Sequence, residues 1–193
     1  MAGIGPTGRR DVQSLWSRGE GERTVTTLAV TGHMDLTDES VPLIRTALDE
    51  LLRQYAAAAD DVLVGVSCMA KGSDSLFAEA VLAAGGSLVA VIPAKDYRRN
   101  HVAADYAPTF DGLVEAADEV LVLPYETAGP QAYAAANAVL LECADRLVAV
   151  WNGEPPGGRG GGTADAVLDA RKAGIHVDVV WPEGAVRSSV THS

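Results

Sequence analysis

Six short runs of aliphatic and β-branched residues recur along the chain. They span residues 26–31, 62–66, 87–92, 119–123, 146–151 and 176–181. Most of them lack the polar–apolar alternation of a strand that faces water on one side. Near-continuous apolar runs of this length are typical of parallel strands buried on both faces. We therefore expect six strands in one buried sheet.

The segments between these runs have a helical period, because their apolar residues recur three and four positions apart. The expected helices cover residues 44–52, 76–83, 105–117, 132–143 and 163–173. Gly174 is a natural stop for the last of them. Strand–helix alternation predicts an α/β fold, with a Rossmann-like parallel sheet and helices on both faces in a three-layer α/β/α arrangement.

The length of 193 residues fits one domain of ordinary size. We expect a flexible N-terminal segment over residues 1–23, a single domain over 24–182 and a flexible polar tail over 183–193. No apolar signal region precedes the domain, and no stretch reaches the length of a membrane span. These features predict a cytoplasmic protein with no membrane contact.

The formal net charge of −11 narrows the choice of partner. A surface of this sign repels nucleic acid unless a basic patch intervenes, so nucleic acid is not expected as a partner. The two cysteines, Cys68 and Cys143, lie far apart and show no metal-binding or redox spacing. We expect neither a metal nor a cofactor.

Ligands of open parallel sheets bind beyond the carboxyl ends of the strands. The residues at these ends are therefore the candidates for ligand binding. They are Gly32 and His33 after the first run, Ser67, Lys71, Gly72, Ser73 and Asp74 after the second, Pro93, Lys95 and Arg98 after the third, and Trp151 and Asn152 after the fifth. For His33, a structural role is the alternative to a role in binding.

A glycine-rich segment gives the sharpest signal. Five glycines lie within residues 157–162, and a helix is expected to begin directly after them at Thr163. Glycine lets a ligand approach the backbone closely, and a helix N-terminus adds unpaired N–H groups and partial positive charge. We expect Gly160, Gly161, Gly162 and Thr163 to hold a phosphate. The alternative is a plain loop followed by an ordinary helix cap at Thr163.

Residues 72–74 repeat this arrangement in the loop after the second run, with Ser73 as a helix cap or a second phosphate contact. Five basic residues fall in the same set of loops, which favours an anionic ligand over solvated surface charges. They are Lys71, Lys95, Arg98, Arg99 and Arg159. The P-loop, nucleophile-elbow and dinucleotide-binding glycine motifs are absent from the sequence, which argues against those enzyme classes.

Three of these segments resemble the SLOG superfamily, with its LOG and DprA-like branches. They are residues 31–33, 65–93 and 144–165. The resemblance implies a Rossmannoid domain that forms a homodimer and binds a nucleotide or a nucleotide-derived ligand. A sensing or binding domain, with Asp165 contacting the ribose, is the leading interpretation.

LOG-type enzymes hydrolyse the N-glycosidic bond of nucleoside monophosphates, and this activity is the alternative. Their glycine motif ends in a glutamate, where this chain has Ala166, preceded by Asp165. Glycosidic cleavage needs a carboxylate close to the sugar, and a residue one position earlier points about 100° away on a helix. If the chain is an enzyme, Asp165 or Glu79 is the candidate acid.

Overall fold

The computed structural model describes residues 25–57, 62–157 and 162–188. Its centre is a six-stranded sheet in the order β4-β3-β2-β1-β5-β6, with every neighbouring pair parallel. The strands are β1 (Val25–Gly32), β2 (Val62–Ser67), β3 (Ser87–Ile92), β4 (Glu119–Val122), β5 (Arg146–Val150) and β6 (His176–Val179). The predicted parallel sheet is confirmed, and its strands begin and end within two residues of the predicted positions.

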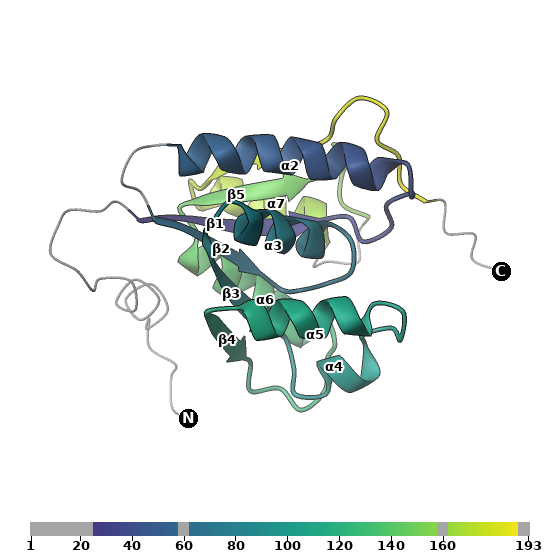
Figure 1. The fold of residues 1–193 in the computed structure, drawn as a ribbon. Helices are drawn as coiled ribbons and strands as arrows, with labels where there is room; N and C mark the ends of the chain where they lie inside the picture. Colours follow the sequence, from purple (N-terminus) through teal and green to yellow (C-terminus); the bar gives the residue numbers. More distant parts are fainter. Residues whose placement is uncertain (1–24, 58–61, 158–161, 189–193) are drawn as a thin grey trace, which may run out of the picture.

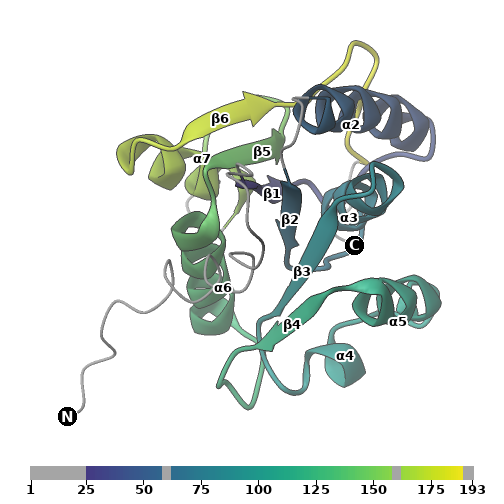
Figure 2. The same cartoon turned by 60° about the vertical axis from the view of Figure 1, so that its left-hand side comes forward.

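Helices cover both faces of the sheet (Figure 1 and Figure 2). One face carries α2 (Ser40–Ala56), α3 (Ser73–Ala83) and α5 (Ala107–Ala116), and the other carries α6 (Pro130–Cys143) and α7 (Thr163–Lys172). The three-layer arrangement is therefore confirmed. The sequence did not predict α4 (Tyr97–Asn100), a short helix after β3. Within the described ranges, no helix combines the length and apolar character needed to cross a lipid bilayer.

The hydrophobic core follows from the alternation of side chains along the central strands. In β1, Leu28 and Val30 pack with α2 and α3, while Ala29 between them packs with α6 and α7. All three side chains are fully buried. The edge strands β4 and β6 instead mix partly buried and exposed residues. The expectation of burial on both faces therefore holds for the central strands and is wrong for the two edges.

Residues 183–188 pack against the loop between β1 and α2. The Ser40 hydroxyl donates to Val186 O at 2.9 Å, and Arg187 forms an ion pair with Asp35 at 2.9 Å. This part of the expected tail is therefore attached to the domain. Residues 189–193 and the expected N-terminal segment lie outside the described residues, so the division of the chain stays a prediction.

Candidate functional site

The order of the strands singles out one position on the sheet. The chain proceeds outward from β1 through β2, β3 and β4, and then returns to β5 on the other side of β1. Such a reversal opens a crevice beyond the carboxyl ends of the two strands, where ligands bind in open α/β sheets. The loops after β2 and β5 lie at the same edge, because both strands pair in parallel with β1.

His33 and Asn152 meet where β1 and β5 end. The His33 ring nitrogen Nε2 lies 3.0 Å from Asn152 Oδ1 and 3.3 Å from the Asn152 backbone nitrogen. The His33 ring packs edge-to-face on Trp181, with 5.5 Å between the ring centroids. Burial lowers the pKa of His33, although the contact with Asn152 opposes this shift. Burial therefore favours the neutral form of the His33 imidazole.

Arg187 links the loop after β1 to the loop after β5. Its guanidinium pairs with Asp35 from the loop after β1 and lies 3.4 Å from Glu154 Oε2 in the loop after β5. Its charge also acts on His33, since it contributes to the lowered pKa of that residue. The sequence offered no signal for this contact, because an arginine in a polar C-terminal segment has no distinguishing pattern.

The β2–α3 junction, residues 67–74, is packed tightly against the end of β1. A Cβ at Gly32 would lie 2.4 Å from Ser73 Cβ, and a Cβ at Gly72 would lie 2.8 Å from Met34 O. Gly72 also has a φ of +95°, which favours glycine. Ser73 Oγ donates to His33 O at 2.6 Å. These contacts give the two glycines and Ser73 a packing role.

The expected helix cap at Ser73 needs a correction. Gly72 occupies the N-cap position of α3, and Ser73 is the first helical residue. The same holds at the other glycine segment, where Gly162 is the N-cap of α7 and Thr163 follows it. At both helices a glycine occupies the N-cap position, and the residue with the hydroxyl side chain is the first residue of the helix.

Asp74 is a buried carboxylate in the β2–α3 junction, with only 8% of its surface exposed. Its Oδ2 accepts the Ala70 N–H at 3.3 Å, and the buried Ser67 hydroxyl donates to the Asp74 backbone carbonyl. Burial raises the pKa of Asp74 to about 7, because desolvation outweighs the hydrogen bond from Ala70. A group of this pKa gains or loses its proton near neutral pH.

In the β5–α7 junction, most of the described residues, 151–157 and 162–165, are exposed or partly buried. The Gly162 N–H donates to Asp165 Oδ2 at 3.1 Å, and this oxygen, at 3.6 Å, is the nearest atom to a Cβ built at Gly162. Trp151 Nε1 donates to Glu154 O, and the Arg171 guanidinium lies over the Trp151 ring. Arg159, Gly160 and Gly161 lie outside the described residues.

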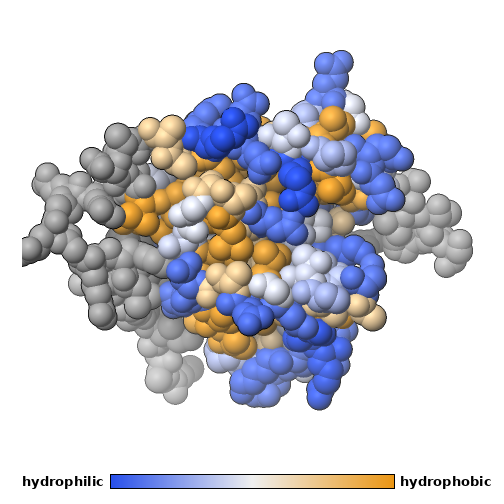
Figure 3. Space-filling view, viewed as in Figure 1, coloured by the Kyte–Doolittle hydropathy of each residue, from blue (hydrophilic) through white to orange (hydrophobic). Residues whose placement is uncertain are grey.

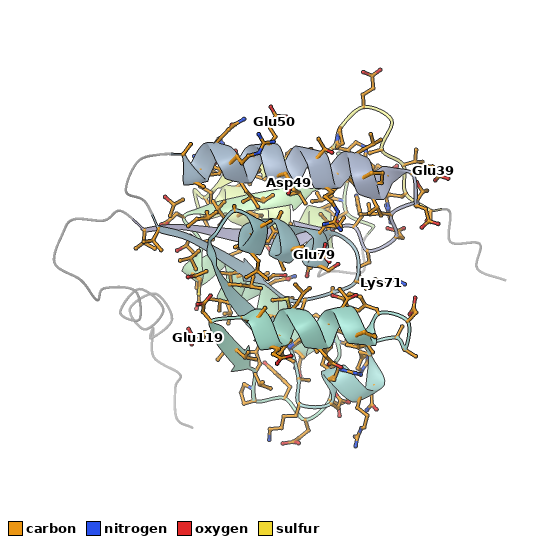
Figure 4. All side chains as sticks on the ribbon, in the orientation of Figure 1. Glu39, Asp49, Glu50, Lys71, Glu79 and Glu119 are labelled. Atoms are coloured by element: carbon orange, nitrogen blue, oxygen red, sulfur yellow. The ribbon has the colours of Figure 1, made fainter. Side chains whose placement is uncertain are left out.

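Three of the five basic residues predicted for this rim are paired with acids. Of the other two, Arg99 donates to Asn100 Oδ1 at 3.3 Å, and Arg159 lies outside the described residues. Lys71 lies 2.6 Å from Asp105, and Lys95 lies 2.6 Å from Glu126. Arg98 likewise pairs with Asp111. All three pairs are exposed, and Figure 4 labels Lys71 near the N-terminal end of α3. The rim is therefore lined by ion pairs, while Pro93 beside it is buried.

The chain is similar to known proteins in its structure. A scan against protein-family models and a search of curated proteins found no match. Among solved structures, DNA processing protein A (DprA) from Streptococcus pneumoniae is similar, with a TM-score of 0.59 and 20% identity over 80% of this chain and 50% of that one. DprA from Helicobacter pylori has a TM-score of 0.55 and 18% sequence identity, and the match covers 81% of this chain and 65% of that one. The protein TM1055 has a TM-score of 0.51 and 20% sequence identity, and the match covers 79% of this chain and 72% of that one.

The chain has a Rossmann-like fold similar to the folds of these three proteins. It spans half of the S. pneumoniae chain and 65% of the H. pylori chain. The H. pylori structure is described as showing a single-stranded DNA binding mode. This finding overturns the exclusion of nucleic acid as a partner. That exclusion rested on net charge, which does not describe the local surface that a polyanion meets.

Within this fold, the two acids suggested for hydrolysis lie on different helices. Glu79 pairs with Arg45 of α2 at 2.6 Å, and Figure 4 shows it on α3. It is six residues, or about 9 Å, along the helix from Ser73. Asp165 accepts the Gly162 N–H at the start of α7. Each carboxylate therefore already has a partner within the fold.

Proposed function

We propose that this chain binds a nucleotide or a nucleotide-derived ligand at the carboxyl ends of β1 and β5. The observation that carries the proposal is the reversal of chain order between these strands, with polar His33 and Asn152 beside it. The N-termini of α3 and α7 belong to the loops on either side. A cytoplasmic location and the lack of a resident metal or cofactor remain predictions from the sequence.

The phosphate of this ligand would bind at the N-terminus of α7. The first turn of a helix has N–H groups without intrahelical partners, and these favour an anion. Among the described residues beyond its chain neighbours, the nearest atom to a Cβ built at Gly162 is Asp165 Oδ2 at 3.6 Å, which supports space for such a group. The neutral His33 and the amide of Asn152 would hydrogen-bond the sugar or base, and Asp165 would contact the ribose.

Single-stranded DNA is a second candidate ligand, favoured by the similarity to H. pylori DprA. The ion pairs on the rim do not oppose it strongly, because exposed pairs contribute only about 0–1 kcal/mol each. Phosphates along a strand could therefore replace the acids as partners of Lys71, Lys95 and Arg98.

Calorimetry with AMP, ADP-ribose and an oligothymidylate would test the proposal on the full chain. Gly162→Asp adds a negative charge at the α7 N-terminus, and we expect nucleotide affinity to fall about tenfold or more, the size of a charge-assisted contact. Gly112→Asp is the matched control, since Gly112 lies in α5 with open space around its Cβ position. It should bind as the wild type does.

Two outcomes would decide against nucleotide binding at this position, and two further outcomes would favour an alternative function. The proposal fails if the wild type binds no mononucleotide, or if both aspartate variants have equal effects. Binding of the oligothymidylate alone would favour the second candidate. Release of free base from AMP, abolished by Asp165→Asn, would instead establish the hydrolase alternative.

A further inference from the structure

Three aromatic rings lie in a row between α4 and the first turn of α6. The rings of Tyr97 and His101 are nearly parallel, with an interplanar angle of 10° and 6.0 Å between their centroids. Tyr133 meets His101 at 87°, with 6.5 Å between the centroids, and its hydroxyl lies 3.4 Å from His101 Nδ1. Both separations fall within the range of favourable aromatic contacts. We call Tyr97, His101 and Tyr133 the aromatic corner.

The inner ring of the aromatic corner is buried, and the two outer rings reach solvent. Tyr97 is 7% exposed and Tyr133 is 36% exposed, and His101 is also exposed. Tyr97 covers one face of the His101 imidazole, so the exposure of His101 comes from its other face and its edges. A flat ring could therefore stack on His101 with Tyr133 beside it.

Hydrogen bonds hold the two walls of the corner in place. The Lys95 N–H donates to Tyr125 O at 2.9 Å, and the Ala128 N–H donates to Asp96 Oδ1 at 2.8 Å. The other oxygen of Asp96 accepts the Asn100 side-chain amide at 3.0 Å. These bonds join α4 to the segment that leads into α6. The position of His101 relative to Tyr133 is therefore fixed before a ligand arrives, which lowers the cost of binding.

Arg99 supplies charge beside the corner. It is exposed, lies two residues before His101 and makes no ion pair within the ranges that the structure describes, since its Nε donates to Asn100 Oδ1. A guanidinium without a carboxylate partner favours a phosphate and disfavours a cation. Figure 3 shows mostly hydrophilic surface at the lower right, where Figure 1 places α4. The surroundings therefore suit a ligand that combines a flat ring with negative charge.

We propose that the aromatic corner stacks a nucleobase and that Arg99 contacts a phosphate next to that base. Stacking uses the π-face that every base has, so the site would accept different bases. This inference rests on the proposed function in one respect, namely that the ligand contains a nucleotide. It adds a site for the base that the crevice at β1 and β5 does not include.

The aromatic corner is separate from that crevice. α4 follows β3, and β2 lies between β3 and β1 in the sheet. Neighbouring strands lie about 4.8 Å apart, so the ends of β3 and β1 are about 10 Å apart. The base at the corner could belong to a free nucleotide or to a nucleic-acid strand. Comparing the two ligands distinguishes these sources.

Fluorescence anisotropy on the full chain would test the corner with two strands of equal length, an oligothymidylate and an abasic strand. Tyr133→Ala should weaken binding of the oligothymidylate about fivefold or more, the usual effect of removing a stacked ring. It should leave the abasic strand unchanged. Tyr133→Phe keeps the ring and should bind as the wild type does. Leu168→Ala is the matched control, since Leu168 on α7 is 40% exposed.

The outcomes separate this inference from the proposed function. An equal loss for both strands in Tyr133→Ala, or no loss for any base-containing ligand, would overturn the corner as a base site. A fivefold loss with AMP would assign the site to the base of a free nucleotide. A loss with the oligothymidylate alone would assign it to a strand. If AMP does not bind but the oligothymidylate binds in a manner that depends on Tyr133, the corner stands and the nucleotide crevice fails.

An oligothymidylate that carries 5-iodouracil gives a positive signal that does not depend on disrupting the protein. Irradiation joins this base to an aromatic side chain in contact with it, and mass spectrometry of the digested protein locates the bond. We expect the crosslink at Tyr133 or His101. Crosslinks only at Trp151 or Trp181, the rings beside the crevice, would count against the corner.

Discussion

The two loop–helix junctions beside β1 look alike in sequence and differ in structure. Each has a glycine at the helix N-cap and an aspartate in the first turn that accepts a loop amide. In the β2–α3 junction the aspartate is buried, and the glycine meets the backbone of the loop after β1. In the β5–α7 junction both residues are more open. Glycine before a helix therefore serves close packing at one junction, and at the other it has no close contact with the described residues beyond its chain neighbours.

Replacing each N-cap glycine by alanine tests this difference directly. Gly72→Ala must accept a φ of +95° and a Cβ 2.8 Å from Met34 O, so we expect a loss of about 3 kcal/mol in unfolding free energy. Gly162 has a φ of −83°, and Gly162→Ala should lose less than about 1 kcal/mol. Urea denaturation of both variants measures the two losses. Equal losses would show that the junctions are packed alike.

The sequence predicted the architecture because burial leaves a local pattern. The run at 87–92 and the stripe that includes Ile44, Leu48 and Leu52 correspond to β3 and to the buried face of α2. The alternation of strands and helices along the chain then predicted which loops lie at the carboxyl ends of the strands. α4 was missed because its four residues are too few for a periodic signal.

The details of the site depend on contacts that no local pattern encodes. His33 and Asn152 are 119 positions apart, and Arg187 and Asp35 are 152 apart. The steric role of Gly32 is likewise visible only once β1 lies beside Ser73. The prediction that nucleic acid is not a partner was wrong for a related reason. It used the net charge summed over the whole chain, which does not describe the local surface that a nucleic acid would contact.

The buried aspartate should make stability depend on pH. Burial raises the pKa of Asp74 to about 7 from an ordinary value of 3.8. Between these values the folded protein binds more protons than the unfolded chain, so stability falls as pH rises and levels off above pH 7. The fall should be on the order of a few kcal/mol, since each pKa unit corresponds to about 1.4 kcal/mol.

Asp74→Asn should remove most of this pH dependence and raise stability at pH 8, because its side-chain oxygen can still accept the Ala70 N–H without carrying charge. Asp165→Asn, the corresponding change at the exposed junction, should lower stability by no more than about 1 kcal/mol through the loss of a charge near a helix N-terminus. Thermal melts from pH 4 to pH 8 measure both. An unchanged slope in Asp74→Asn would mean that Asp74 is not the group that titrates.

The smallest expected effect concerns Lys71, the exposed cation of the β2–α3 junction. Its ion pair with Asp105 is exposed on both sides, so Lys71→Gln should change stability by no more than about 1 kcal/mol. If this junction also contacts a bound single strand, the slope of log affinity against log salt should become shallower by about 0.7, the contribution of one phosphate contact. Lys172→Gln is the control, since Lys172 has a similar exposed pair with Asp169 at the far end of α7. An unchanged slope in Lys71→Gln would restrict ligand contact to the β5–α7 junction and sharpen the division between packing and binding.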